Sequence, residues 1–204
     1  MSAAPVVLAA GGTGGHLFPA QALAERLVRC GAAVCLITDR RADGFTVKMP
    51  GVDIRQIHAG PLGGGLFRTA SGVAAMAIGF LQARRLLRRL QPAAVVGFGG
   101  YPSVPTMLAA IRLGLPSVIH EQNAVLGRAN RLLAPRVRRI ATGFVATSGL
   151  RPADRARAIY TGNPVRPAIG AVARIAYRPP RADAPIELVI LGGSQGARIF
   201  ADIV

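Results

Sequence analysis

The sequence is poor in several residue types, and each scarcity narrows the class of protein. Its 204 residues include no tryptophan, three tyrosines and seven phenylalanines. Surfaces that bind single-stranded nucleic acid stack bases on aromatic side chains, so this scarcity argues against a nucleic-acid-binding module. The only two cysteines are Cys30 and Cys35, and no histidine lies near them in the sequence. This argues against a disulfide framework or a metal site, and we expect two buried thiols in a reducing cytoplasm.

Acidic residues are also scarce. Nine of them stand against 25 basic residues, among which Lys48 is the only lysine, and the formal net charge is +16. A charge this far from zero suggests a polyanionic partner, which can be nucleic acid, an anionic membrane surface or a phosphorylated substrate. Composition alone does not choose among these partners. The nucleic-acid alternative rests on this charge and on nothing else in the sequence.

Long apolar segments that could target or span a membrane are missing as well. The uncharged run 5–24 lacks a basic n-region and is interrupted by glycines at 11, 12, 14 and 15, unlike a signal peptide. The uncharged run 91–111 is long enough to cross a bilayer, but it is interrupted by the pair Gly99-Gly100 and by Pro102 and Pro105. We therefore expect a soluble, cytoplasmic chain without a leader or a membrane span.

Short apolar runs alternate with helical patterns along the chain. Strands are predicted at 6–9, 33–38, 52–57, 93–98, 117–120, 139–142 and 158–160. Helices are predicted at 19–30, 69–90, 104–113 and 127–133. This alternation predicts an α/β fold, a Rossmann-like parallel sheet with helices on both faces. Ligands of such sheets bind at the carboxyl ends of the strands.

The composition changes near the C-terminal end. Residues 164–185 are rich in proline, alanine and arginine and predict a linker after an N-terminal domain at 1–163. An apolar strand pattern, Ile186–Leu191, follows, and then a glycine-rich turn and the start of a helix. One strand and part of a helix cannot bury their own apolar faces. We therefore expect 186–204 to be the incomplete start of a second Rossmann-like domain.

Three glycine-rich segments follow predicted strands: Gly11–His16, Gly97–Tyr101 and Gly192–Gly196. Glycine lets the backbone approach a ligand closely, and a helix N-terminus presents free N–H groups to anions. An NAD(P)-binding turn is an alternative for the first segment, with Asp39 as a ribose-binding acid. The third glycine of that fingerprint falls on Leu17, however. Three such loops together favour a cleft between two similar domains.

Four consecutive polar residues, His120–Asn123, end the predicted fifth strand. Polar side chains at the carboxyl end of a buried strand seldom serve packing, so we predict that they belong to a functional site. Asn123 is also suited to capping the helix that follows, and the two roles are compatible.

Five motifs together carry a resemblance to a known family. They are GGTGGHLFP at Gly11–Pro19, GFGGYPSVP at Gly97–Pro105, HEQN at His120–Asn123, TGNPVR at Thr161–Arg166 and GGSQGAR at Gly192–Arg198. In order and spacing they resemble the MurG family, the undecaprenyl-diphospho-muramoyl-pentapeptide N-acetylglucosaminyltransferases of peptidoglycan synthesis. The resemblance covers the whole chain. It implies a GT-B architecture, in which two Rossmann-like domains face each other across a cleft.

The resemblance also implies an activity. N-acetylglucosamine would pass from UDP-GlcNAc, with inversion, to the muramoyl 4-hydroxyl of undecaprenyl-diphospho-MurNAc-pentapeptide, converting lipid I to lipid II. No metal and no cofactor besides the UDP-GlcNAc donor are implied. Because most of the implied donor-binding domain lies beyond Val204, we expect the 204-residue chain to be inactive or nearly so by itself.

Individual roles follow from the same resemblance. Contacts to the donor are implied for Thr13, Gly14, Gly15, Asn123, Arg166 and Ser194. The acceptor diphosphate is expected beside His16, Gly99, Gly100 and Tyr101. An inverting displacement needs a base that takes the hydroxyl proton, and His16 and Glu121 both have suitable chemistry. The sequence does not choose between these two candidates.

The predicted helix 69–90 suggests a contact with a membrane. Apolar side chains, including Ile78, Phe80 and Leu81, precede four arginines, which are Arg84, Arg85, Arg88 and Arg89. An apolar patch beside arginines suits an anionic leaflet, whereas the alternative is a core-facing helix with a solvated basic end. The lipid-linked acceptor of the resembled family favours the first interpretation. We therefore expect a peripheral protein on the cytoplasmic side of the inner membrane, with anionic lipids as partners and no nucleic acid.

Overall fold

The computed structural model describes residues 4–11, 13–39, 49–60 and 66–177, together with the single positions 179, 185 and 189. The chain divides into two compact units, Met1–Arg166 and Pro167–Val204. The predicted boundary, after residue 163, falls close to this division. The strand predicted at 186–191 and the third glycine-rich segment, with Ser194, lie outside the described residues.

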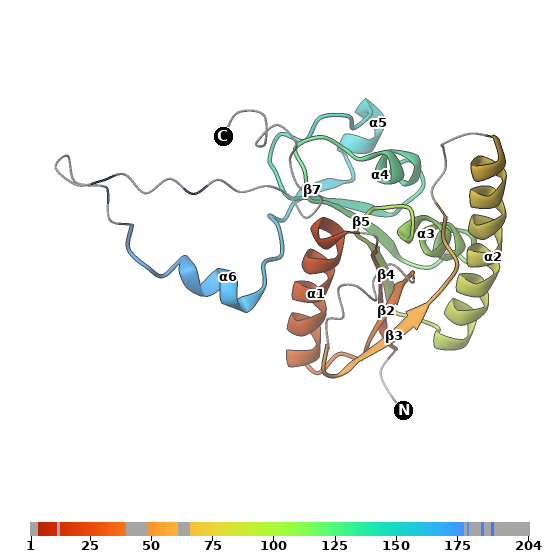
Figure 1. Ribbon diagram of the computed structural model, residues 1–204, viewed down its shortest axis with the longest axis horizontal. Helices are drawn as coiled ribbons and strands as arrows, with labels where there is room; N and C mark the ends of the chain where they lie inside the picture. Colours follow the sequence, from red (N-terminus) through yellow and green to blue (C-terminus); the bar gives the residue numbers. More distant parts are fainter. Residues whose placement is uncertain are drawn as a thin grey trace. The chain divides into compact units, whose positions relative to one another are not determined.

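The first unit is built on one parallel sheet (Figure 1). Within the described residues its strands are β1 (Val6–Ala9), β2 (Val34–Thr38), β3 (Val52–Gln56), β4 (Ala94–Gly97), β5 (Ser117–Glu121), β6 (Arg139–Thr142) and β7 (Ala158–Tyr160). Their order is β3-β2-β1-β4-β5-β6-β7, and every adjacent pair is parallel. The order reverses between β1 and β4, the position at which such sheets open a crevice at their carboxyl edge. The predicted α/β class is confirmed.

The helices differ more from their predicted bounds than the strands do. They are α1 (Gly14–Arg29), α2 (Leu66–Leu90), α3 (Ser103–Arg112), α4 (Arg128–Leu133), α5 (Pro152–Arg155) and α6 (Pro167–Val172). The prediction that the first helix begins at Pro19 is wrong. Thr13 is extended, and its carbonyl accepts hydrogen bonds from the N–H groups of His16 and Leu17, so the helix begins within the glycines. The short α5 was not predicted, and α6 lies in the segment predicted as a linker.

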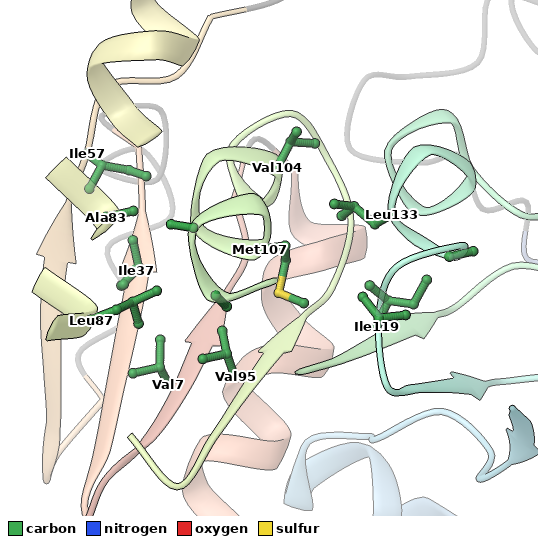
Figure 2. Close-up of a cluster of buried hydrophobic side chains, with 14 of the residues drawn as sticks. Val7, Ile37, Ile57, Ala83, Leu87, Val95, Val104, Met107, Ile119 and Leu133 are labelled. Atoms are coloured by element: carbon green, nitrogen blue, oxygen red, sulfur yellow. The ribbon is translucent and has the colours of Figure 1, made fainter. Parts of the chain in front are cut away.

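The sheet is covered on both faces because its strands alternate their side chains. Val7 of β1 points into a core shared with α2, α3 and α4. The next residue, Leu8, points into a second core against α1. Figure 2 shows the larger core, in which Met107 of α3 lies among the side chains of the sheet. Both predicted layers of helices are therefore present.

The inner face of α2 carries small residues where it crosses the segment that follows β3. Gly72 and Gly79 lie seven residues apart, so they share a face of the helix. A Cβ atom on Gly79 would lie 1.9 Å from the backbone oxygen of His58, and one on Gly60 would lie 3.0 Å from the Cα atom of Gly72. No other residue fits at Gly79 without moving the backbone. The glycines fix how α2 sits on the sheet.

The structure also bears on the expected burial of both cysteines and on the expected absence of a membrane-spanning segment. Cys35 is buried, and this burial raises the pKa of its thiol to about 12. Cys30 is exposed, which corrects the expectation of two buried thiols, because it lies at the C-terminal end of α1. Among the helices that the structure describes, none is long and apolar enough to cross a membrane.

Candidate functional site

The first two glycine-rich segments meet at the carboxyl edge of β1 and β4. Gly99 and Gly100 have φ angles of +87° and +73°, a backbone region that favours glycine. A Cβ atom on Gly100 would lie 3.0 Å from the backbone oxygen of Gly11 and 3.1 Å from Cδ2 of His16. The turn therefore lets the imidazole of His16 lie directly against the backbone. Three of the predicted acceptor-site residues are brought together in this way.

A cavity of about 160 Å³ opens at this edge. It is lined by His16, Gly99, Gly100, Tyr101, Glu121, Asn123, Gly127, Arg128, Ala129 and Asn130. The helices α1 and α3 begin beside these residues, and neither has an acidic residue in its first turn. Their N-terminal N–H groups and helix dipoles favour negative charge near the cavity. The site is suited to an anionic ligand such as a diphosphate.

Glu121 is buried at the end of β5, and only 1% of its surface is exposed. One carboxylate oxygen accepts hydrogen bonds from the backbone N–H of Asn123 at 3.1 Å and from its side-chain amide at 2.9 Å. The other oxygen accepts from the N–H of Gly127 at 2.8 Å and from the amide of Asn130 at 2.9 Å. The carboxylate thus holds the loop between β5 and α4 in place. This use of both oxygens is suited to positioning, and it favours His16 over Glu121 as the base.

Hydrogen bonds connect His16 to the motif His120–Asn123 and to the motif Thr161–Arg166. Nδ1 of His16 lies 3.1 Å from Oε1 of Gln122, whose Nε2 lies 3.0 Å from Nδ1 of His120. Nε2 of His120 lies 3.0 Å from the backbone oxygen of Gly162, and the amide of Asn163 donates to the backbone oxygen of Gln122 at 3.1 Å. Burial lowers the pKa of His120, against smaller opposing effects of the Gly162 carbonyl and Glu121.

Arg166 lies near the beginning of α1. Its Cζ atom is 4.0 Å from the centroid of the Phe18 ring, a cation–π contact. A Cβ atom on Gly14 would lie 2.7 Å from Cε2 of Phe18, so the same ring covers the first residue of α1. The predicted donor-site residues Thr13 and Gly14 therefore share one neighbourhood with Arg166. Gly15 is exposed beside them, and Asn123 is exposed at the rim of the cavity.

Asn130 is a site residue that the sequence analysis missed. It is buried in α4, and its amide nitrogen also donates to the backbone oxygen of His120 at 3.1 Å. Its Oδ1 is buried and has no hydrogen-bond partner among the described residues, although the side chain lines the cavity. Because α4 also contains Arg128 and Arg131, no local pattern in the sequence singled out this asparagine.

The outer face of α2 combines exposed apolar and basic residues. We define it by Val73, Ala74, Ala77, Ile78, Leu81, Arg85, Arg88 and Arg89, all of which are exposed. Ile78 and Leu81 expose 46% and 61% of their surfaces, and Arg84 is only partly exposed. The prediction that Phe80 belongs to this surface is wrong. Its side chain packs against the larger core, because it lies next to Gly79 and Ala83 on the inner side of the helix.

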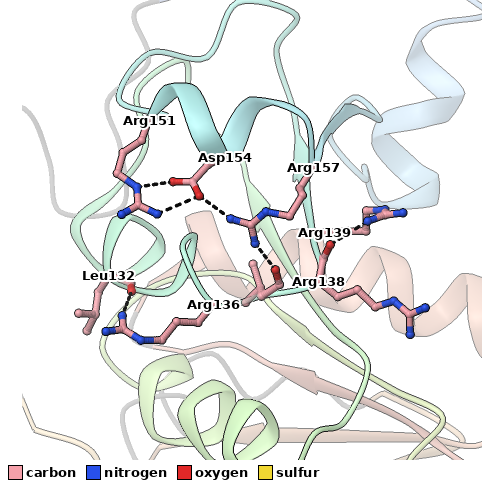
Figure 3. Close-up of polar contacts among 8 residues, drawn as sticks. Leu132, Arg136, Arg138, Arg139, Arg151, Asp154 and Arg157 are labelled. Carbon is pink, nitrogen blue, oxygen red and sulfur yellow. Dashed lines mark hydrogen bonds and ion pairs between the residues drawn. The ribbon is translucent and has the colours of Figure 1, made fainter.

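A second buried carboxylate, that of Asp154, lies among arginines (Figure 3) and is not part of the cavity lining. Asp154 of α5 is 1% exposed and accepts hydrogen bonds from Nε and Nη2 of Arg151 at 2.6 and 3.0 Å. Arg157 also donates to Asp154, and to the backbone oxygen of Val137 before β6. The hydrogen bond from Arg151 is the main reason why the pKa of Asp154 is lowered. This cluster attaches α5 to the segment that leads into β6.

The parallel sheet and the glycine turns at its carboxyl edge define a Rossmann-like domain with a ligand site at that edge. The model of the glycosyltransferase family 28 N-terminal domain matches residues 6–142, and the chain belongs to glycosyltransferase family 28.

Individual relatives narrow the comparison further. A protein of Rhodospirillum centenum is 53% identical over 204 residues, which are 100% of this chain and 54% of that protein. A protein of Rhizobium meliloti is 50% identical over 200 residues, 98% of this chain and 53% of that protein. Both are named UDP-N-acetylglucosamine--N-acetylmuramyl-(pentapeptide) pyrophosphoryl-undecaprenol N-acetylglucosamine transferase.

The solved structure of Acinetobacter baumannii MurG is similar with a TM-score of 0.71 and 32% identity, over 97% of this chain and 54% of that one. The predicted resemblance to the MurG family and its GT-B architecture is confirmed. The chain spans about half the length of the curated relatives that it matches.

Proposed function

We propose that this chain forms the acceptor-binding half of an inverting N-acetylglucosaminyltransferase of peptidoglycan synthesis. The whole protein would transfer N-acetylglucosamine from UDP-GlcNAc to the muramoyl 4-hydroxyl of undecaprenyl-diphospho-MurNAc-pentapeptide. The main support is the cavity that brings His16 against the Gly99-Gly100 turn, beside two helix N-termini without acidic residues. The names of relatives that are 50–53% identical support the choice of substrates.

The chemistry assigns separate roles to the residues at the edge of the sheet. The acceptor diphosphate lies near the two glycine turns and Tyr101, where backbone N–H groups and helix dipoles favour negative charge. His16 takes the proton from the 4-hydroxyl as that oxygen attacks the anomeric carbon of the donor sugar. Arg166 and the N-terminus of α1 stabilise the negative charge on the departing UDP diphosphate. The proposal requires no metal ion.

Replacing His16 in the full-length protein tests this assignment. His16→Ala should lower kcat by roughly 10²- to 10⁴-fold, the usual contribution of a general base, while the KM for UDP-GlcNAc changes little. Transfer of labelled N-acetylglucosamine to lipid I is the measurement. The matched control is His58→Ala, since His58 is exposed and bonded to Gln82 outside the cavity. The same assay on the 204-residue chain should detect little or no turnover. Unchanged catalysis by His16→Ala would remove His16 from the mechanism.

The protein should also bind peripherally to the cytoplasmic leaflet of the inner membrane through the outer face of α2. Two effects contribute: burial of Ile78 and Leu81, and attraction of the arginines to anionic lipid, worth roughly 1 kcal/mol for each basic residue near the surface. The attraction is screened over roughly 8 Å at physiological salt, so salt should weaken binding without abolishing it.

Vesicle co-sedimentation tests this surface. Glutamine at all four arginines of α2, at 84, 85, 88 and 89, should weaken binding to anionic vesicles and leave binding to neutral vesicles nearly unchanged. A matched control removes the same charge elsewhere, from the exposed arginines Arg26, Arg29, Arg112 and Arg155. Equal binding of the wild type and both variants to anionic vesicles would show that neither net charge nor the arginines of α2 attract the protein to the membrane. Equal losses in the two variants would show that net charge alone attracts the protein.

A further inference from the structure

We propose that Gln122 and His120 are positioning residues that set the tautomer of His16. They place the ring hydrogen of His16 on Nδ1 and leave Nε2 unprotonated. The inference deepens the proposed function and rests on it only for the use of Nε2 as the base. The hydrogen bonds themselves do not depend on which reaction the protein performs.

The hydrogen bonds run from His16 through Gln122 and His120 to Gly162. The backbone carbonyl of Gly162, at the end of this series, fixes which atoms donate. Nε2 of His120 lies 3.0 Å from the oxygen of Gly162, and a carbonyl oxygen can only accept. Nε2 of His120 therefore carries its hydrogen. In a neutral imidazole the other ring nitrogen, Nδ1, is then an acceptor. The burial that lowers the pKa of His120 favours this neutral form.

A second carbonyl fixes the orientation of Gln122. Its Nε2 lies 3.0 Å from Nδ1 of His120 and 3.0 Å from the backbone oxygen of His120, so both partners of this nitrogen accept. The opposite orientation of the amide would place Oε1 against two acceptors. The amide nitrogen thus faces His120, and Oε1 must face His16.

The consequence for His16 follows directly. Nδ1 of His16 lies 3.1 Å from Oε1 of Gln122, which is an acceptor, so Nδ1 donates. The neutral ring then has an unprotonated Nε2, which makes no hydrogen bond within the described part of the chain and belongs to a side chain that lines the cavity. In water the neutral imidazole of histidine favours hydrogen on Nε2. Gln122 therefore reverses the intrinsic preference at the position where a base is needed.

The same contacts could instead serve only to join three loops. His16 follows β1, Gln122 follows β5 and Gly162 follows β7, so the hydrogen bonds connect three strand ends across the sheet. A purely structural connection makes no demand on the tautomer of His16. The tautomer is therefore the observable that separates the two roles.

Nitrogen-15 NMR of the histidine rings measures this tautomer directly. The chain contains three histidines, so histidine-labelled protein gives three pairs of ring-nitrogen signals. At a pH where the rings are neutral, we expect hydrogen on Nδ1 in His16 and on Nε2 in His120. Hydrogen on Nε2 of His16 in the wild type would overturn the proposal without any variant.

Two substitutions at Gln122 sharpen the test. Gln122→Met keeps the length of the side chain and removes the acceptor, so His16 should shift to hydrogen on Nε2 while His120 stays bonded to Gly162. Gln122→Glu keeps an acceptor for Nδ1 of His16, so its wild-type tautomer should be kept, whereas the second carboxylate oxygen faces Nδ1 of His120 and should place a hydrogen on that nitrogen. The matched control is Gln82→Met, because Gln82 accepts from the backbone N–H of His58 and lies beside Nδ1 of that ring. It should alter only His58. An unchanged His16 in Gln122→Met would overturn the proposal.

Kinetics of the full-length protein separate this inference from the proposed function. Gln122→Met should lower kcat by at least about tenfold, with the KM for UDP-GlcNAc unchanged, as expected for impaired proton transfer. Loss of the wild-type tautomer with full kcat would overturn the positioning role and leave the transferase intact. The expected tautomers in a protein without transferase activity would overturn the proposed function and support the positioning role.

Discussion

Two regions of the molecule bury a carboxylate to the same extent but surround it differently. Glu121 and Asp154 each expose 1% of their surface. The donors to Glu121 are uncharged backbone and side-chain amides. Asp154 is held by two guanidinium groups, from Arg151 and Arg157. Burial alone therefore does not distinguish a carboxylate that organises a site from one that attaches a surface turn.

The chemistry of the donors makes that distinction. Every donor to Glu121 belongs to the loop or helix that lines the cavity, so displacing this carboxylate displaces the site. Arg151 is largely exposed, and solvent can replace Asp154 as its partner. Loss of the first carboxylate should therefore cost more than loss of the second.

The largest effect is expected for Glu121→Gln. The amide nitrogen of the new side chain would face N–H donors and leave buried groups unpaired, so the free energy of unfolding should fall by about 2–4 kcal/mol. Urea denaturation followed by circular dichroism measures the loss. Glu25→Gln is the matched control, because Glu25 accepts from Gln21 on the less buried surface of α1 and should change stability by roughly 0.5 kcal/mol or less. Equal losses in the two variants would contradict the structural role of Glu121.

A smaller effect is expected for Asp154→Asn. At neutral pH the free energy of unfolding should fall by about 1 kcal/mol, because solvent screens Arg151 and the asparagine keeps one acceptor. The folded-state pKa of Asp154 lies below its ordinary value of 3.8, so its charge stabilises the fold above that pH. The stabilisation is lost as the pH falls through the lowered pKa, and the two proteins should then converge. A loss as large as that in Glu121→Gln would remove the contrast between the regions.

The smallest effect should appear on mild acidification. The pKa of His120 is lowered from 6.5, so the unfolded chain binds this proton first. Stability is therefore complete above about pH 6.5 and declines as the pH falls toward the lowered pKa. Denaturation between pH 7 and pH 5 should reveal the decline, and Asp154→Asn should retain it because Asp154 does not titrate there. A flat profile for the wild type would contradict the neutral state of His120.

The strands were the most predictable part of the fold. Most are short apolar runs between turn signals, and a strand buried on both faces, such as β2, has little freedom to shift its bounds. The edge strand β3 is mostly polar and exposed, but it was predicted as well. The start of α1 was not predictable because glycine disfavours helices, whereas here the carbonyl of Thr13 and the close packing of Phe18 on Gly14 stabilise it. The helix α6 was not predicted, because the proline, alanine and arginine content of its segment is also typical of linkers.

The sequence indicated several of the residues that line the cavity, but neither Asn130 nor the hydrogen bonds among them. The polar motif after β5 and the glycine turns indicated which strand ends matter. The sequence left His16 and Glu121 as equal candidates for the base, because only the structure shows that four donors occupy Glu121. It placed Phe80 on the exposed face since a helix of small and apolar residues does not reveal its rotation. Gly72 and Gly79, which define that rotation, were not recognised as contacts.

The close approach at Gly79 has a geometric consequence for the whole domain. One residue of rotation would turn α2 by about 100° and bring a Cβ atom toward the oxygen of His58, which lies 1.9 Å from the Cβ position of Gly79. The azimuth of the outer face of α2 is thus fixed relative to the sheet. Under the proposed function, a bilayer that meets this face would therefore meet the carboxyl edge of the sheet at a set angle.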